Sequence, residues 1–133
     1  MSLEKTATDA LLAYLGGIGN GLTLCASDGL TAGQVFPALV VTVAGQGEVA
    51  DGSGVYRVAC RVEVMTELDT ANARTQHAAN VAAVRDKLED QSTLLTAMSS
   101  GARCFGVTRF SWLTEMKERL AVGGVSFDAI MAT

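Results

Sequence analysis

The chain has 133 residues, of which 49% are hydrophobic and 18% charged, and its formal net charge is −4. This length fits one domain with a single core. The negative charge comes from residues 1–54, which hold five acids and one base, whereas residues 55–133 hold nine of each sign. No stretch concentrates Lys or Arg, which argues against a dedicated nucleic-acid-binding surface.

Other classes are disfavoured by single features. The longest apolar run, residues 36–43, is far shorter than the roughly 20 residues of a membrane helix. Residues 1–15 lack the apolar core of an export signal, so we expect a soluble protein made inside the cell. Three widely spaced cysteines and a single histidine do not suit a zinc site, and we expect reduced, mostly buried thiols and no cofactor.

The N-terminal part predicts a helix followed by a linker. Within residues 1–15 the apolar side chains recur at helical spacing. Ser2 is the candidate N-cap, and Gly16 is the glycine expected to end the helix. Residues 16–34 are rich in Gly, Ser and Thr and are expected to be a linker with one possible short strand at 21–26.

The glycines of "LGGIGNGL" (15–22) invite comparison with a phosphate-binding loop. They follow a helix instead of a strand, the dinucleotide pattern fails at Leu22, and no P-loop lysine follows Gly21. We therefore expect a helix stop and a hinge that lets the first helix pack apart from, or swing against, the sheet.

Two antiparallel strands are predicted next, at residues 36–43 and 55–66, joined by a flexible glycine-bearing connection at 44–54. The second strand alternates clearly between two faces. One face carries Tyr56, Val58, Cys60, Val62 and Val64; the other carries Arg57, Ala59, Arg61 and Glu63. Such alternation indicates a sheet with one face on a core and one polar face.

A helix is expected from Asp69 or Thr70, as its cap, to about Asp90. Its inner line is His77, Val81, Val84 and Leu88. One or two more helical turns are expected after it, ended by Gly101.

Strands at residues 103–112 and 119–131 complete the predicted elements, with a polar turn between them. In the last strand the apolar phase slips at Gly123-Gly124, which predicts a β-bulge or tight bend there. The order α-β-β-α-β-β predicts an α+β fold: an antiparallel, possibly mixed, sheet of about four strands with helices on one face. The whole chain, 1–133, is expected to form one domain whose sheet-and-helix core spans 36–131.

Few residues are candidates for a catalytic role. His77 is the one candidate general base near neutral pH, but no nucleophile motif accompanies it, so a histidine packed against the sheet is favoured. Phe110 and Trp112 share a strand face and fit either the core, which is favoured, or an interface patch.

Exposure and charge select candidate interface residues. They are Gln46, Glu48, Asp51, Arg57, Arg61, Glu63 and Arg109. A flat polar sheet face bearing both charge signs packs against a copy of itself or a partner, or faces water, and the sequence leaves both open.

The run from "FPALVVTV" through "GVYRVACRVEVMTELD" to "TQHAANVAAVRDKLED" resembles the tail terminator (tail-completion, minor tail) proteins of long-tailed bacteriophages. The shared features are a Pro-led strand, a strand ending in Thr-x-x-Asp (Thr66 and Asp69), and a helix with an early His (His77) and a late Leu (Leu88). The resemblance covers about residues 36–90.

This resemblance implies a virion protein without enzymatic activity. It implies a homo-oligomeric ring, usually hexameric, that caps the tail tube and joins it to a neck or head-completion protein, with DNA passing through the lumen. Other phage neck or tail components, such as a head-closure or tube protein, and a bacterial binding module unrelated to phage remain open alternatives.

Overall fold

The computed structural model describes residues 3–19, 21–26, 35–117 and 119–132. In chain order its elements are α1 (Leu3–Leu15), β1 (Thr23–Ala26), β2 (Ala38–Glu48), β3 (Val55–Glu67), α2 (Ala73–Glu89), α3 (Gln91–Met98), β4 (Arg103–Lys117) and β5 (Leu120–Ala132). None of the described helices has the length and apolar character needed to cross a bilayer.

The five described strands form one sheet in the order β1-β2-β3-β5-β4. β1 pairs with β2 in parallel, and all other neighbours are antiparallel, including the predicted pair β2 and β3. The α+β class is confirmed. The expected four strands and the order α-β-β-α-β-β are amended, because β1 lies within the predicted linker and α3 is a helix of its own. The possible strand at 21–26 is thus confirmed over Thr23–Ala26.

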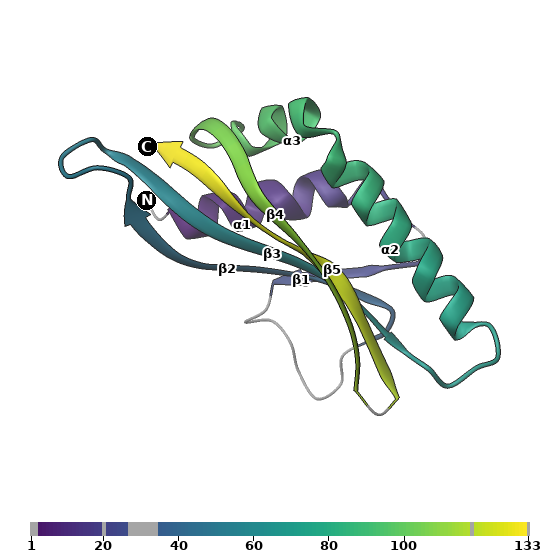
Figure 1. Ribbon diagram of the computed structural model, residues 1–133. Coiled ribbons are helices and arrows are strands. Elements are labelled where there is room, and N and C mark those ends of the chain that lie inside the picture. The colour runs from purple at the N-terminus through teal and green to yellow at the C-terminus, as the bar shows by residue number, and fades with distance from the viewer. Residues whose placement is uncertain (1–2, 20, 27–34, 118, 133) are drawn as a thin grey trace.

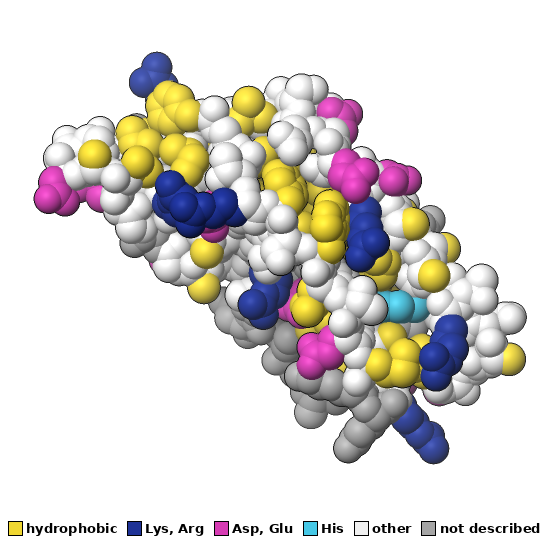
Figure 2. Space-filling view, in the orientation of Figure 1, with side chains coloured by type: hydrophobic (Ala, Val, Ile, Leu, Met, Phe, Trp, Pro, Cys, Tyr) yellow, Lys and Arg dark blue, Asp and Glu magenta, His cyan; other side chains and the backbone are white. Residues whose placement is uncertain are grey.

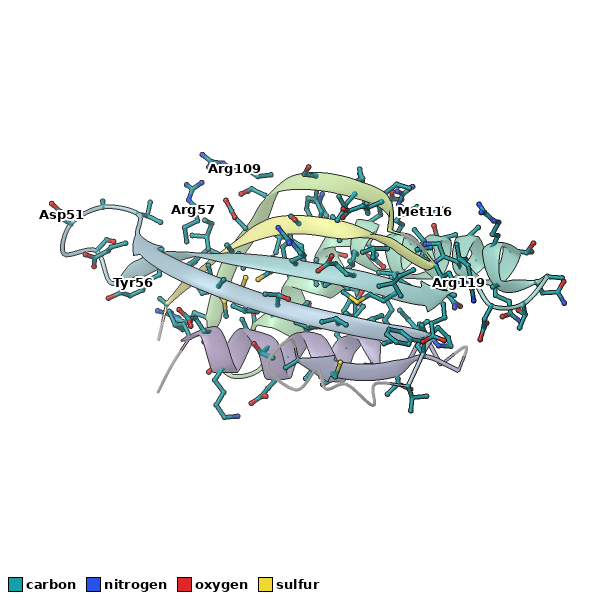
Figure 3. All side chains as sticks on the ribbon, turned by 90° about the horizontal axis from the view of Figure 1, so that it is seen from below. Asp51, Tyr56, Arg57, Arg109, Met116 and Arg119 are labelled. Carbon is teal, nitrogen blue, oxygen red and sulfur yellow. The ribbon has the colours of Figure 1, made fainter. Side chains whose placement is uncertain are left out.

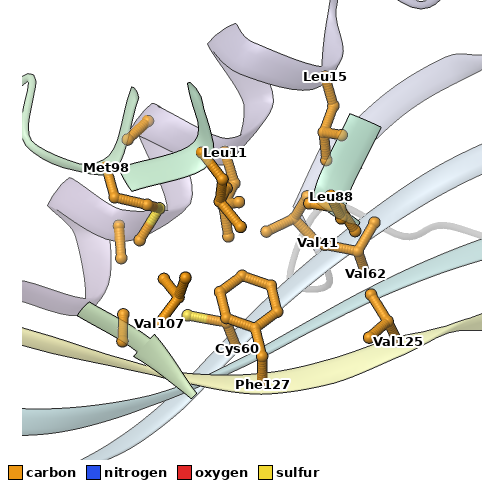
Figure 4. Close-up of a cluster of buried hydrophobic side chains, with 14 of the residues drawn as sticks. Leu11, Leu15, Val41, Cys60, Val62, Leu88, Met98, Val107, Val125 and Phe127 are labelled. Carbon is orange, nitrogen blue, oxygen red and sulfur yellow. The ribbon is translucent and has the colours of Figure 1, made fainter. Parts of the chain in front are cut away.

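The three helices cover one face of the sheet (Figure 1), as expected. The alternation of β3 explains this arrangement, because its even-numbered apolar residues all face the helices. Those residues join a single core with the inward sides of α1, α2 and α3 (Figure 4). Its most deeply buried large side chains include Phe127, Leu11, Leu15, Leu88, Leu94 and Met98.

Helix α1 belongs to that core. Leu3, Leu11 and Leu15 are buried in it, so the prediction that α1 packs apart from the sheet is wrong. The helix ends at Leu15, as expected, and the Gly16 N–H still donates to the Leu12 carbonyl at 3.0 Å. Left-handed backbone occurs after the helix, at Gly19 and Gly21.

The β2–β3 hairpin is more ordered than predicted. β2 continues to Glu48 through a bulge at Gly45, whose φ is 74°, so the first part of the expected flexible connection, 44–48, is strand. In the remaining loop the Gly52 N–H donates to Glu48 Oε1 at 3.0 Å, and the Gly54 N–H donates to Oε2 at 2.9 Å. One carboxylate therefore closes the turn.

The C-terminal hairpin also differs from the prediction. β4 runs to Lys117, so the turn expected at 113–119 is too long. β5 pairs with β3 and β4 without a register shift at Gly123-Gly124, and the predicted bulge there is wrong. The register shifts lie in β4 instead, between Cys104 and Gly106 and between Thr108 and Ser111.

Close packing explains the two glycines. A Cβ at Gly123 would lie 2.8 Å from Val81 Cγ2 of α2, and one at Gly124 would collide with the Val62 carbonyl oxygen of β3. The first glycine lets α2 approach the sheet, and the second lets β3 and β5 approach each other.

The helix caps differ from those expected. The N-cap of α2 is Asn72, which makes no side-chain cap hydrogen bond, instead of Asp69 or Thr70. Asp90 ends α2 and caps α3, where Oδ1 accepts from the Thr93 N–H at 3.3 Å. Hydrogen bonds from Thr93 lower the pKa of the Asp90 carboxyl below its usual value. α3 ends at Met98, before the expected Gly101.

Replacing Gly124 with Ala is expected to lower the free energy of unfolding by about 1–3 kcal/mol, because the added methyl collides with the β3 backbone. Gly47→Ala is the matched control. Gly47 also lies in a strand, but a Cβ there would have nothing within 4 Å, so a change within roughly 0.5 kcal/mol is expected. Urea unfolding of both variants measures the difference; equal stabilities would contradict the close approach.

Candidate functional site

The side of the sheet away from α1 carries a polar patch. We call it the open face and define it by Arg57, Arg61 and Glu63 of β3, Ser126 and Asp128 of β5, and Thr108 of β4. Strand register places them together, since Arg61 pairs with Ser126 and Thr108 pairs with Asp128. The polar face predicted from β3 is therefore present, and β4 and β5 extend it.

Asp128 lies between two arginines on the open face. Its Oδ2 is 3.7 Å from Arg57 Nη1 and 3.8 Å from Arg109 Nη1. The Asp128 side chain is 19% exposed, whereas that of Arg109 is 70% exposed. Figure 3 shows Arg57 and Arg109 side by side on the side of the sheet opposite α1. Such partly solvated pairs stabilise a fold by about 0–1 kcal/mol, so this cluster orients guanidinium groups more than it supports the fold.

Arg109 occupies a backbone position that glycine normally fills. It lies in the second β4 bulge with a φ of 59°. Among the residues that the structure describes, all others with a left-handed backbone are glycines. A side chain in this conformation costs about 1–2 kcal/mol. The bulge turns the Arg109 guanidinium toward Asp128.

The hairpin tip holds the remaining predicted candidates. Asp51 is exposed at the end of the loop, where Figure 3 places it at the far end of the molecule. Glu48 is engaged with the loop backbone and is a structural residue in this position. Gln46 lies in β2 opposite Val58, and its side chain is outside the described part. The structure thus separates the hairpin candidates from the Arg57–Asp128–Arg109 cluster.

β4 is one of the two edge strands of the described sheet, opposite β1, and carries exposed apolar side chains. Phe105 is 56% exposed, Met116 51% and Trp112 40%. Phe110 instead stacks on Phe127 with ring centroids 5.3 Å apart and joins the core. The expectation that both aromatic residues enter the core holds for Phe110 only, because Trp112 lies at the margin of α2.

An open groove of about 370 Å³ lies between α2 and the β4–β5 pair. Arg85 of α2 borders it, with its guanidinium carbon 5.0 Å from the Trp112 ring centroid. The Nε of Arg85 is buried and has no hydrogen-bond partner among the described residues. Figure 2 looks onto this side of the molecule, where the histidine appears in cyan among basic and apolar side chains.

His77 lies in the wall of this groove and is held by the sheet. Its Nδ1 is 2.8 Å from Oγ1 of Thr66, a buried residue at the end of β3. Burial lowers the pKa of His77 below 6.5. The prediction of a histidine packed against the sheet is confirmed, with Thr66 as its partner.

Cys25, Cys60 and Cys104 are not joined in a disulfide. Burial raises the pKa of Cys60 to about 12 and raises those of Cys25 and Cys104, so all three remain protonated at neutral pH. The described residues contain no group of three side chains suited to hold a metal ion.

Two residues of these surfaces were missed in the sequence, Asp128 and Arg85. Asp128 has a signal that is visible in retrospect, because it is the single acid in an otherwise apolar alternating strand. Arg85 has none, because its significance depends on Trp112, which comes from a strand 27 positions later.

No protein-family model matches the chain, and no curated protein matches it. Among solved structures, a chain of the "Virion of native gene transfer agent (GTA) particle" has a similar fold. It is 15% identical, and the match covers 97% of this chain and 94% of that chain with a TM-score of 0.48. A likeness at this level assigns neither a family nor a role.

Arg109→Gly is expected to raise the free energy of unfolding by about 1 kcal/mol, because glycine adopts the left-handed conformation without a steric cost. The control Thr108→Gly, at the preceding residue, should lower it by roughly 0.5–1 kcal/mol. Thermal melts compare the two. A loss of stability in Arg109→Gly would show that the Asp128 pair outweighs the backbone strain.

Stability should fall as the pH drops below 6.5, because the unfolded chain protonates His77 near that pH while the folded chain, with its lowered pKa, stays neutral. Unfolding midpoints between about pH 7.5 and pH 5.5 should decline more steeply in the wild type than in His77→Gln, which cannot titrate. Parallel profiles would contradict the pKa shift.

Proposed function

We propose that this chain is a structural virion subunit of the tail terminator type, with no catalytic role. Copies form a closed ring, expected to be a hexamer, that caps the tail tube and joins it to a neck or head-completion protein. DNA passes through the lumen as cargo. The proposal combines the sequence resemblance over residues 36–90 with the surfaces described above.

The observation that carries the proposal is the outer strand β4. It is 15 residues long, ends the described sheet, and exposes Phe105, Trp112 and Met116. An edge strand with apolar side chains and unpaired backbone groups favours association with another chain. A head-to-tail association of identical subunits gives a ring when its rotation closes.

The residues that carry the resemblance support a structural role. Thr66 and His77 bond to each other, and Leu88 is fully buried. In this chain they hold α2 against the sheet. Chains that share these residues are therefore expected to pack a helix on the sheet in the same way.

Light scattering coupled to size-exclusion chromatography, followed by negative-stain imaging, tests the ring. We expect a discrete oligomer of about six subunits, or a concentration-dependent equilibrium leading to it, that binds the end of purified tail tubes. A strict monomer at high concentration that does not bind tubes would refute the proposal. Long stacked tubes would favour a tube protein instead.

A further inference from the structure

We propose that the β2–β3 hairpin tip of one copy docks into the groove between α2 and β4 of the next copy, with Val49 in the groove and Asp51 paired with Arg85. The inference rests on the proposed ring and names the surfaces that form its subunit contact. The occupant of the groove is a second copy of this chain.

The groove has the shape of a receptor site. Part of its lining comes from small residues, including Gly123, which has no side chain; the rest comes from His77, Val81, Arg85, Asp86 and Glu89. Ala78 and Ala82 of α2 and Thr114 of β4 leave the space open. The groove admits a branched apolar side chain without displacement of α2.

Arg85 provides the polar anchor. Its guanidinium lies over the Trp112 ring, while the buried Nε lacks an acceptor among the described residues. Arg85 as a whole is half-buried and lines the groove, so a carboxylate from another chain can pair with its guanidinium group. The site therefore requires an apolar side chain and an acid close together.

The hairpin tip presents this pair. Val49 is 50% exposed, and the exposed Asp51 follows two positions later. The loop is already shaped, because Glu48 binds two of its backbone N–H groups and the Val49 N–H donates to the Val55 carbonyl at 2.8 Å. A preformed loop loses little conformational entropy on docking.

The hairpin tip and the groove lie far apart on the molecule, which suits head-to-tail contacts between copies. The hairpin lies beyond the Val55–Ala132 end of the β3–β5 pair, whereas the groove lies near the Val64–Gly123 end. Figures 1 and 3 show the hairpin and the opposite end of the sheet at the two extremes of the molecule. One copy cannot fill its own groove, and repeated head-to-tail contacts of tip with groove give a ring when their rotation closes.

Nearby acids restrict where the carboxylate binds. Asp86 and Glu89 of α2 also line the groove, and they repel an acid placed next to them. The favourable position for Asp51 is consequently at Arg85, on the side of Trp112.

A charge exchange tests the contact. Asp51→Arg and Arg85→Glu are each expected to weaken self-association at least tenfold, measured by sedimentation or light scattering of the full chain. An equimolar mixture of the two variants should recover ring mass, because each altered tip then meets a complementary altered groove. Asp9→Arg on the exposed side of α1 makes the same charge change elsewhere and should leave association unchanged.

Val49→Asp gives an independent measurement that leaves Arg85 and its stacking on Trp112 intact. It should also abolish association, while circular dichroism confirms that the variant is folded. Because Val49 is exposed, its replacement is not expected to disturb folding.

The outcomes separate this contact from the ring itself. If the wild type forms rings and the three variants keep them, the contact is refuted and the ring stands. If the wild type neither associates nor binds tubes, both fail. If the variants keep ring mass but lose tube binding, the groove receives the tube protein, and the contact between copies is overturned.

Discussion

The burial of one face of the central strands β3 and β5 under three helices is the interaction on which the rest of the structure depends. Opposite each other on that face are the pairs Val62–Val125 and Cys60–Phe127. A shift of one residue in register would move these side chains to the solvent, so the register is strongly specified. The same register then places every second residue on the open face, where Arg57 and Asp128 meet.

Stability and surface chemistry are thus divided between the two faces. The helix-covered face supplies the hydrophobic stabilisation, and the partly solvated ion pairs of the open face add little to it. Charges on the open face and at the hairpin tip are consequently free to be selected for contacts with other chains. The glycines of β5 connect the two roles, since the close approach of α2 at Gly123 also leaves the groove beside it.

Strong local periodicity explains which elements the sequence predicts well. The alternation of β3 and the helical spacing of α2 depend on one buried face each, and both are visible in the sequence. β1 is only four residues long and is defined by a parallel partner 15 positions later, so its pattern alone gave no more than a possible strand. The sequence predicts a turn at the end of β4 because its residues there are mainly polar, and in the structure both faces of the strand are largely exposed at that end.

The candidate site was predictable in part for a similar reason. Charge and alternation identify Arg57, Arg61 and Glu63, since they require knowledge of one strand only. The partners that give the surfaces their chemistry lie on other strands and helices: Asp128 opposite Ala59, and Arg85 over Trp112. The backbone strain at Arg109 also has no sequence signal, because glycine is the residue that such a position predicts.

The two bulges of β4 limit how further strands can add to the free edge of the sheet. They interrupt the ladder at Phe105 and again around Arg109, so the uninterrupted part of the outer strand runs only from Ser111 to Lys117. An incoming strand following the whole edge would lose its hydrogen bonds at both breaks, which disfavours the indefinite stacking of sheets that produces fibrils. The edge is therefore a poor template for amyloid, although it exposes apolar side chains.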